Sequence, residues 1–78
     1  MNFARPELLS LGMTIEIEQE ADNRWIAEVP SISGALAYGQ SRQEAVSRVE
    51  TLVLRILADR LEHGEMAPEL AEVFTVAA

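Results

Sequence analysis

Apolar and polar residues alternate strictly over residues 13–19, and this pattern constrains the fold more than any other feature of the chain. The stretch reads Met-Thr-Ile-Glu-Ile-Glu-Gln. A period of two is typical of a strand with one buried face. The residues predicted to face the core are Met13, Ile15 and Ile17. The chain must therefore contain a sheet with one face toward a core and the other toward solvent.

A second strand is predicted over residues 25–29, which read Trp-Ile-Ala-Glu-Val and repeat the alternation. Cross-strand partners share a face, so the apolar positions match only if odd-numbered residues pair with odd-numbered residues. That register requires a loop with an odd number of residues. Residues 21–23 supply it, with Asn23 in the left-handed region. A two-residue turn would instead set Glu28 against Ile17 and bury a carboxylate without a partner.

A long helix is predicted to begin at the capping box Ser-Arg-Gln-Glu of residues 41–44 and to end near His63, before Gly64. The Ser41 hydroxyl would accept a hydrogen bond from the Glu44 amide, and Glu44 would reach back to the Ser41 amide. At about 100° per residue, the stripe toward the sheet consists of Ala45, Val49, Leu52, Val53 and Ile56. The opposite face is polar and includes the i,i+4 pairs Glu44–Arg48 and Arg55–Asp59.

Two short strands complete the predicted order, one at residues 35–38 before the helix and one at residues 72–76 after it. The order strand, strand, strand, helix, strand predicts an α+β fold of β-β-β-α-β type, a small antiparallel sheet with one long helix packed on one face. The chain has 78 residues, which is enough for one domain. We expect an N-terminal arm at residues 1–12 and a single domain at residues 13–78.

The predicted helix carries a second apolar flank that one small sheet cannot cover. It consists of Leu54, Leu57, Ala58 and Leu61. Either the C-terminal segment folds over this flank or a second copy of the chain does. We therefore expect a homo-oligomer, a dimer or higher, with Leu54, Leu57 and Leu61 in its interface.

The chain is strongly acidic, with 13 carboxylates against 6 basic residues and a net charge of −7. Direct nucleic-acid binding is not expected, because it needs a positive patch. A basic partner is favoured instead. The candidate partner-binding residues lie on the outward face of the first two strands: Glu16, Glu18, Ile26 and Glu28.

Two other interpretations of these carboxylates stay open. An ordinary solvated strand face has the same pattern. A metal-dependent nuclease would also cluster carboxylates, but it normally holds Asp residues in a partly buried cleft. Here Asp22 lies in a predicted turn and Asp59 on the polar helix face, so no nuclease activity is expected.

Enzymatic chemistry finds little support elsewhere in the chain. Cysteine is absent, which excludes disulfides, thiolate metal sites and thiol catalysis. The one histidine, His63, is predicted at a helix C-terminus, where the helix dipole favours it. We expect no catalytic residues, no metal and no cofactor. No apolar run reaches the roughly 18 residues of a membrane span, so a cytoplasmic protein without membrane association is expected.

The motifs that connect these elements resemble those of the HicB antitoxins. The resemblance covers about residues 13–65, and Pro68 matches a proline that often follows the helix in that family. Each motif is short, but their order and spacing together are fairly specific. In order they are the strand and turn of residues 15–23, the aromatic-x-Ala strand Trp25-Ile26-Ala27, Pro30-x-x-x-Gly34, Gly39-Gln40-Ser41, and Glu44-Ala45 at the start of the helix.

The resemblance implies a partial ribonuclease-H-like fold and the role of antitoxin in a type II toxin–antitoxin system. Such proteins bind and neutralise HicA, a small basic mRNA-cleaving toxin. The 14 residues after Gly64 are too few for the helix-turn-helix or ribbon-helix-helix that many HicB proteins carry, so no DNA-binding extension is expected. Ala35 stands where the family commonly has cysteine. The alternative is an orphan HicB-like homo-oligomer with a regulatory or structural role and no toxin partner.

Overall fold

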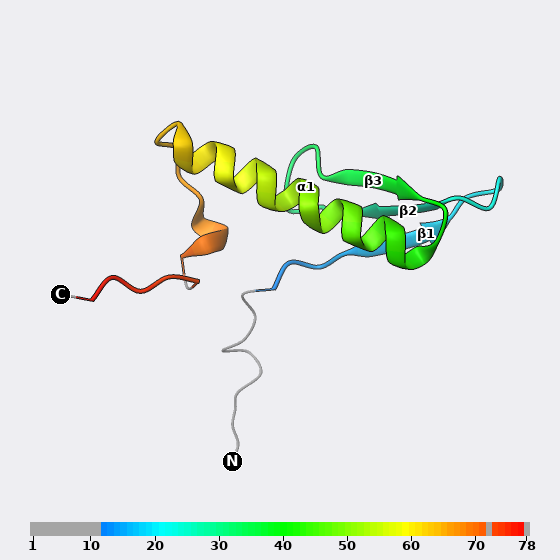
Figure 1. Cartoon of the computed structure of the whole chain (residues 1–78), viewed down its shortest axis with the longest axis horizontal. Coiled ribbons are helices and arrows are strands. Elements are labelled where there is room, and N and C mark those ends of the chain that lie inside the picture. The colour runs from blue at the N-terminus through cyan, green and yellow to red at the C-terminus, as the bar shows by residue number, and fades with distance from the viewer. Residues whose placement is uncertain (1–11, 72, 78) are drawn as a thin grey trace, which may run out of the picture.

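The computed structural model describes residues 12–71 and 73–77, which form one small sheet and one long helix (Figure 1). The strands are antiparallel in the order β1-β2-β3, and the helix α1 covers one face of the sheet. The predicted α+β class is confirmed. The elements are β1 (Glu16–Gln19), β2 (Trp25–Glu28), β3 (Leu36–Gly39), α1 (Arg42–Glu62) and the short 3-10 helix η2 (Pro68–Leu70).

The β1–β2 hairpin has the register that the alternation predicts. Ile17 pairs with Ala27, so odd-numbered residues lie opposite odd-numbered ones. The Glu20 amide donates to the Arg24 carbonyl at 2.7 Å, which leaves a three-residue loop. Within it, Asn23 has φ 71°, as predicted.

An exposed salt bridge joins two residues at this loop, Asp22 and Arg24. The Asp22 carboxylate accepts hydrogen bonds from the Arg24 amide at 3.2 Å and from Arg24 Nε at 2.7 Å. The amide hydrogen bond, followed by the guanidinium beside it, holds the pKa of Asp22 below its ordinary value. The charge of Asp22 is therefore balanced within the turn by Arg24.

Both ends of α1 are capped by the predicted residues. Ser41 Oγ accepts from the Glu44 amide at 3.1 Å, and Gly64, at φ 71°, follows the last turn. The Glu65 amide donates to the Arg60 carbonyl at 2.8 Å, which is the hydrogen bond of a Schellman motif. The helix is thus delimited by local signals before any packing is considered.

Two details of the predicted polar contacts are wrong. Glu44 Oε1 accepts from the Gln40 amide at 2.6 Å and not from the Ser41 amide. Its second oxygen forms the predicted pair with Arg48 at 3.1 Å. The Asp59 carboxylate, predicted to pair with Arg55, instead lies 3.4 Å from the His63 ring nitrogen.

Replacing Ser41 by alanine is expected to lower the free energy of unfolding by about 1 kcal/mol, because the Glu44 amide loses its cap. Urea unfolding followed by circular dichroism measures the change. Ser47→Ala is the matched control, since Ser47 is exposed within α1 and alanine favours helix. An equal loss of unfolding free energy in both variants would show that the Ser41 cap does not stabilise the helix.

The core lies between the sheet and a line of helix residues spaced by four. This line consists of Ala45, Val49, Val53 and Leu57, each at most 4% exposed. Leu52 and Ile56, predicted for the same stripe, are only half-buried. Residues spaced by four drift about 40° around a helix per step, and helix surfaces pack along such ridges. The contact therefore reaches Leu57, which the fixed-angle prediction had placed on the outer flank.

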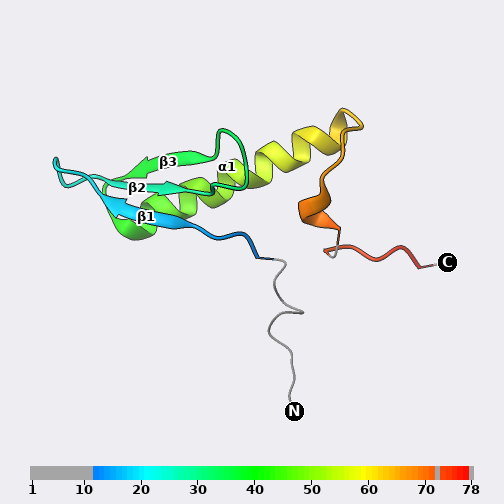
Figure 2. The same ribbon diagram turned by 180° about the vertical axis from the view of Figure 1, so that it is seen from behind.

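The predicted fourth strand is wrong for the part of residues 72–76 that the structure describes. Residues 73–76 form no strand, and Val73 lies in a turn. A strand needs an edge to pair with, and Figure 2 shows this segment running away from the sheet beyond the far end of α1. Residue 72 and residues 1–11 of the predicted N-terminal arm lie outside the described residues.

Candidate partner-binding face

The face of the sheet opposite α1 is uncovered, and we call its six residues the open face. Because paired residues share a face, the strand registers arrange them in two rows across the sheet. Figure 2 shows this side of the sheet with the helix behind it. One row is Glu16, Glu28 and Leu36; the other is Glu18, Ile26 and Tyr38.

The four predicted partner-binding residues come together on this face. Glu16, Glu18, Ile26 and Glu28, together with Ile17, line a shallow hollow of about 250 Å³. Glu16 and Glu28 are direct cross-strand partners, as are Glu18 and Ile26. The outward alternation of β1 and β2 was thus enough to group these side chains.

Leu36 and Tyr38 belong to the same face but were not predicted as site residues. They are 42% and 38% exposed and extend the two rows across β3. The rule that pairs odd with odd residues also pairs even with even, so it could have found them. The sequence of β3 alone does not indicate which face is buried, because a four-residue strand gives too little alternation.

The charges of the open face oppose folding. Carboxylates directly opposite one another on a sheet repel and destabilise it, and Glu16 faces Glu28 in this way. Among the residues that the structure describes, no ion pair reaches Glu16, Glu18 or Glu28. The face therefore holds three negative charges without such a partner, beside its apolar side chains.

One cation lies at the margin of this face. The Arg24 guanidinium lies 4.6 Å from the centroid of the Tyr38 ring, within the range of a cation–π contact. Arg24 also pairs with Asp22, so its charge is already matched. The contact shows that the Tyr38 ring can receive a guanidinium group.

The remaining predicted features are separated from this face or altered. His63 Nδ1 lies 2.8 Å from the Asp59 carbonyl oxygen, at the end of α1. Leu54 and Leu61 are exposed, at 63% and 54%, but Leu57 is only 1% exposed. Leu57 is therefore a core residue and not available to the predicted self-association interface.

Neither metal clusters nor spanning helices occur in the described part of the chain. Within residues 12–71 and 73–77, no group of three His, Cys, Asp or Glu side chains is arranged to hold a metal ion. No helix there has the length and apolar character needed to cross a membrane. Comparison with protein-family models, curated proteins and solved structures finds no match to this chain.

Proposed function

We propose that this protein is a non-enzymatic antitoxin of the HicB type, which neutralises a small basic mRNA-cleaving toxin of the HicA type by covering its basic surface. The observation that carries the proposal is the open face. There, three carboxylates that form no ion pair with any described residue lie beside Ile26, Leu36 and Tyr38. The order of motifs that resembles the HicB antitoxins supports it independently. The proposal places the protein in the cytoplasm, where mRNA is cleaved.

The chemistry of the open face suits arginine and lysine side chains. A carboxylate binds a guanidinium through paired hydrogen bonds, while the aliphatic stem and planar head pack on apolar and aromatic groups. Glu16 and Glu28 repel one another until a cation lies between them, so partner binding would relieve a repulsion of the free protein. The net charge of −7 would also accelerate encounter with a basic protein.

Glu16→Lys/Glu28→Lys is expected to abolish binding to the toxin. The toxin to test is the small basic protein that we expect to be encoded next to this chain. The variant places cations where the partner's cations would bind, and like-charge contact across an interface costs several kcal/mol. Affinity is measured by titration calorimetry with purified proteins, and protection is measured by growth of cells that co-express the toxin. We expect the variant to protect no better than an empty vector.

The control is Glu62→Lys/Glu65→Lys, which makes the same change in net charge at exposed positions near the end of α1. It should bind and protect like the original protein. An equal loss of binding and protection in both variants would show that only the net charge of the protein matters, and not the position of Glu16 and Glu28. Failure of the unaltered protein to retain the neighbouring gene product would overturn the antitoxin proposal.

A further inference from the structure

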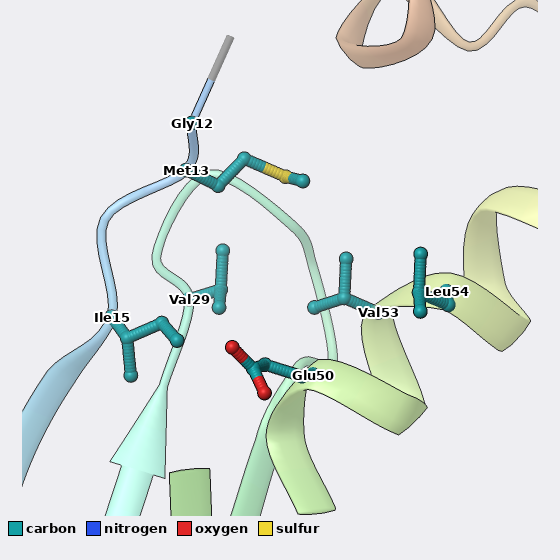
Figure 3. Close-up of a pocket in the computed structure, with 7 residues that line it drawn as sticks. All are labelled: Gly12, Met13, Ile15, Val29, Glu50, Val53 and Leu54. Carbon is teal, nitrogen blue, oxygen red and sulfur yellow. The ribbon is translucent and has the colours of Figure 1, made fainter. Parts of the chain in front are cut away.

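An apolar groove lies on the helix side of the sheet, opposite the open face, beside the segment of residues 12–15 that leads into β1. It has a volume of about 400 Å³. Figure 3 shows Met13, Ile15 and Val29 on one side of it and Val53 and Leu54 on the other, with the Glu50 carboxylate between them. We call it the β1 groove; Gly12 completes its lining.

The groove exists because α1 does not lie centrally over the sheet. The helix packs most closely on β3, less on β2 and least on β1. Met13 and Ile15, which precede β1, and Ile17 within it therefore remain half-buried, although they alternate like residues that face a core. The helix covers this apolar side only in part.

The outer edge of β1 is also unpaired, since β2 is its only neighbour in the described sheet. The other edge strand, β3, has some protection, because Arg48 Nη1 donates to the Tyr38 carbonyl at 3.1 Å. An unpaired edge with an apolar face is a template for another strand. The edge and the β1 groove are adjacent, so one added strand could satisfy both.

The C-terminal segment of residues 73–76 has the character of such a strand. It reads Val-Phe-Thr-Val, and its apolar residues are exposed: Val73 50%, Phe74 69% and Val76 95%. Phe74 and Val76 would lie on one side of an extended chain and Thr75 on the other. The segment therefore has an apolar side, and no other residue among those that the structure describes covers it within one copy.

The position at which residues 73–76 leave the domain favours binding to the groove of a second copy over binding to the groove of the same copy. The Arg60–Glu69 ion pair, at 3.2 Å and with both side chains at most 25% exposed, fastens η2 to the last turns of α1. Leu70 packs against the core from there. Figures 1 and 2 both show residues 73–77 running onward from this point and away from β1.

We propose that two copies of this chain exchange their C-terminal segments, each adding residues 73–76 as an edge strand beside β1 of the other. Phe74 and Val76 enter the β1 groove, next to Ile15 and Leu54, while Thr75 faces outward. A buried aromatic residue covers roughly 150–250 Å², so two exchanged strands with the surfaces they cover reach on the order of 1,000 Å². That area is the lower bound for a specific interface.

This assembly leaves the open face free, since the β1 groove lies on the other side of the sheet. It does not depend on the antitoxin function, and a dimer of this kind would present two open faces. The dependence on salt concentration distinguishes self-association from toxin binding. Self-association of a chain with net charge −7 should strengthen as salt screens repulsion, whereas binding of a basic toxin should weaken.

Light scattering of the full chain at micromolar to millimolar concentration is the first test. We expect a mass of twice 8.6 kDa for the original protein. Phe74→Glu should raise the dissociation constant about a hundredfold or more, because each of the two copies loses one buried aromatic side chain. Leu54→Glu, on the other side of the groove, should have the same effect.

The matched control introduces the same charge where the proposal predicts no contact. Thr51→Glu changes an exposed residue on the polar face of α1. It should remain dimeric. Because Phe74 and Leu54 are exposed in one copy, all three variants should keep the circular dichroism spectrum of the original. A monomeric original protein, or a dimer that Phe74→Glu leaves unchanged, would overturn the proposal.

Cross-linking distinguishes exchange between copies from docking on the same copy. The chain has no cysteine, so Thr14→Cys/Thr75→Cys provides the only two thiols, both on the outward side of the proposed strand pair. A short bismaleimide should give a covalent species of twice 8.6 kDa, in which a peptide containing position 14 is joined to one containing position 75. An internally linked monomer would show that each segment covers its own groove and would refute the exchange.

Discussion

Leu57→Ala is expected to lower the free energy of unfolding by about 2–5 kcal/mol, the range for truncating a buried leucine. Leu57 is 1% exposed and is one of the two largest fully buried side chains. A chain of 78 residues has roughly 4–12 kcal/mol of stability in total, so the variant loses a large part of it. Thermal unfolding followed by circular dichroism should show a fall in Tm of at least about 10 °C.

Leu54→Ala is the matched control, made on the same turn of the helix. Leu54 is 63% exposed, so this substitution should change the stability of one copy by less than about 0.5 kcal/mol. The measurement is made at a concentration at which both proteins are monomeric, which excludes effects on self-association. Similar losses of unfolding free energy in the two variants would contradict the position of Leu57 in the core and would support its predicted position on the outer flank of the helix.

Gly39→Ala is expected to be the most damaging change of a single methyl group. A Cβ at Gly39 would overlap the Ala45 backbone nitrogen and lie 2.9 Å from the Glu44 carbonyl carbon. Both are backbone atoms of the first turn of α1, which cannot rotate aside as a flexible side chain can. We expect a loss of about 1–3 kcal/mol or more, measured by urea unfolding.

Gly12→Ala controls for the effect of removing a glycine from the unfolded chain. A Cβ at Gly12 would have no atom within 4 Å, so this variant should be neutral or slightly more stable. If Gly39→Ala were equally neutral, the helix would have to start farther from β3 than the structure places it. The Gly-x-Ser motif of residues 39–41 would then need another explanation.

The register and loop of the hairpin could be predicted to the residue because local chemistry and burial agreed there, although β1 begins at Glu16 and not at the predicted residue 13. An odd loop, a left-handed Asn23 and the alternation of β1 and β2 all required the same register. The helix limits followed in the same way from Ser41 and Gly64. In these regions the determining contacts lie within a few residues of one another in the sequence.

The errors fall where the answer depends on how elements are placed in three dimensions. The angle at which α1 crosses the sheet decides that Leu57 is buried, and a helical wheel has no such angle. Whether residues 73–76 form a strand depends on whether a sheet edge lies close enough to pair with them. The alternation of apolar and polar residues carries no information on that distance. Leu36 and Tyr38 joined the open face only through the register of β3 with β2.

The three-residue loop at residues 21–23 has a consequence beyond the hairpin. It divides the first two strands by number: odd positions build the interior, and even positions make up the exterior surface. Substitutions at Glu16, Glu18, Ile26 and Glu28 can therefore alter the open face, which we propose binds the partner, while the interior stays intact. Insertion or deletion of a single loop residue would disrupt both faces at once, so the open face can diverge by substitution but not by change of length at this turn.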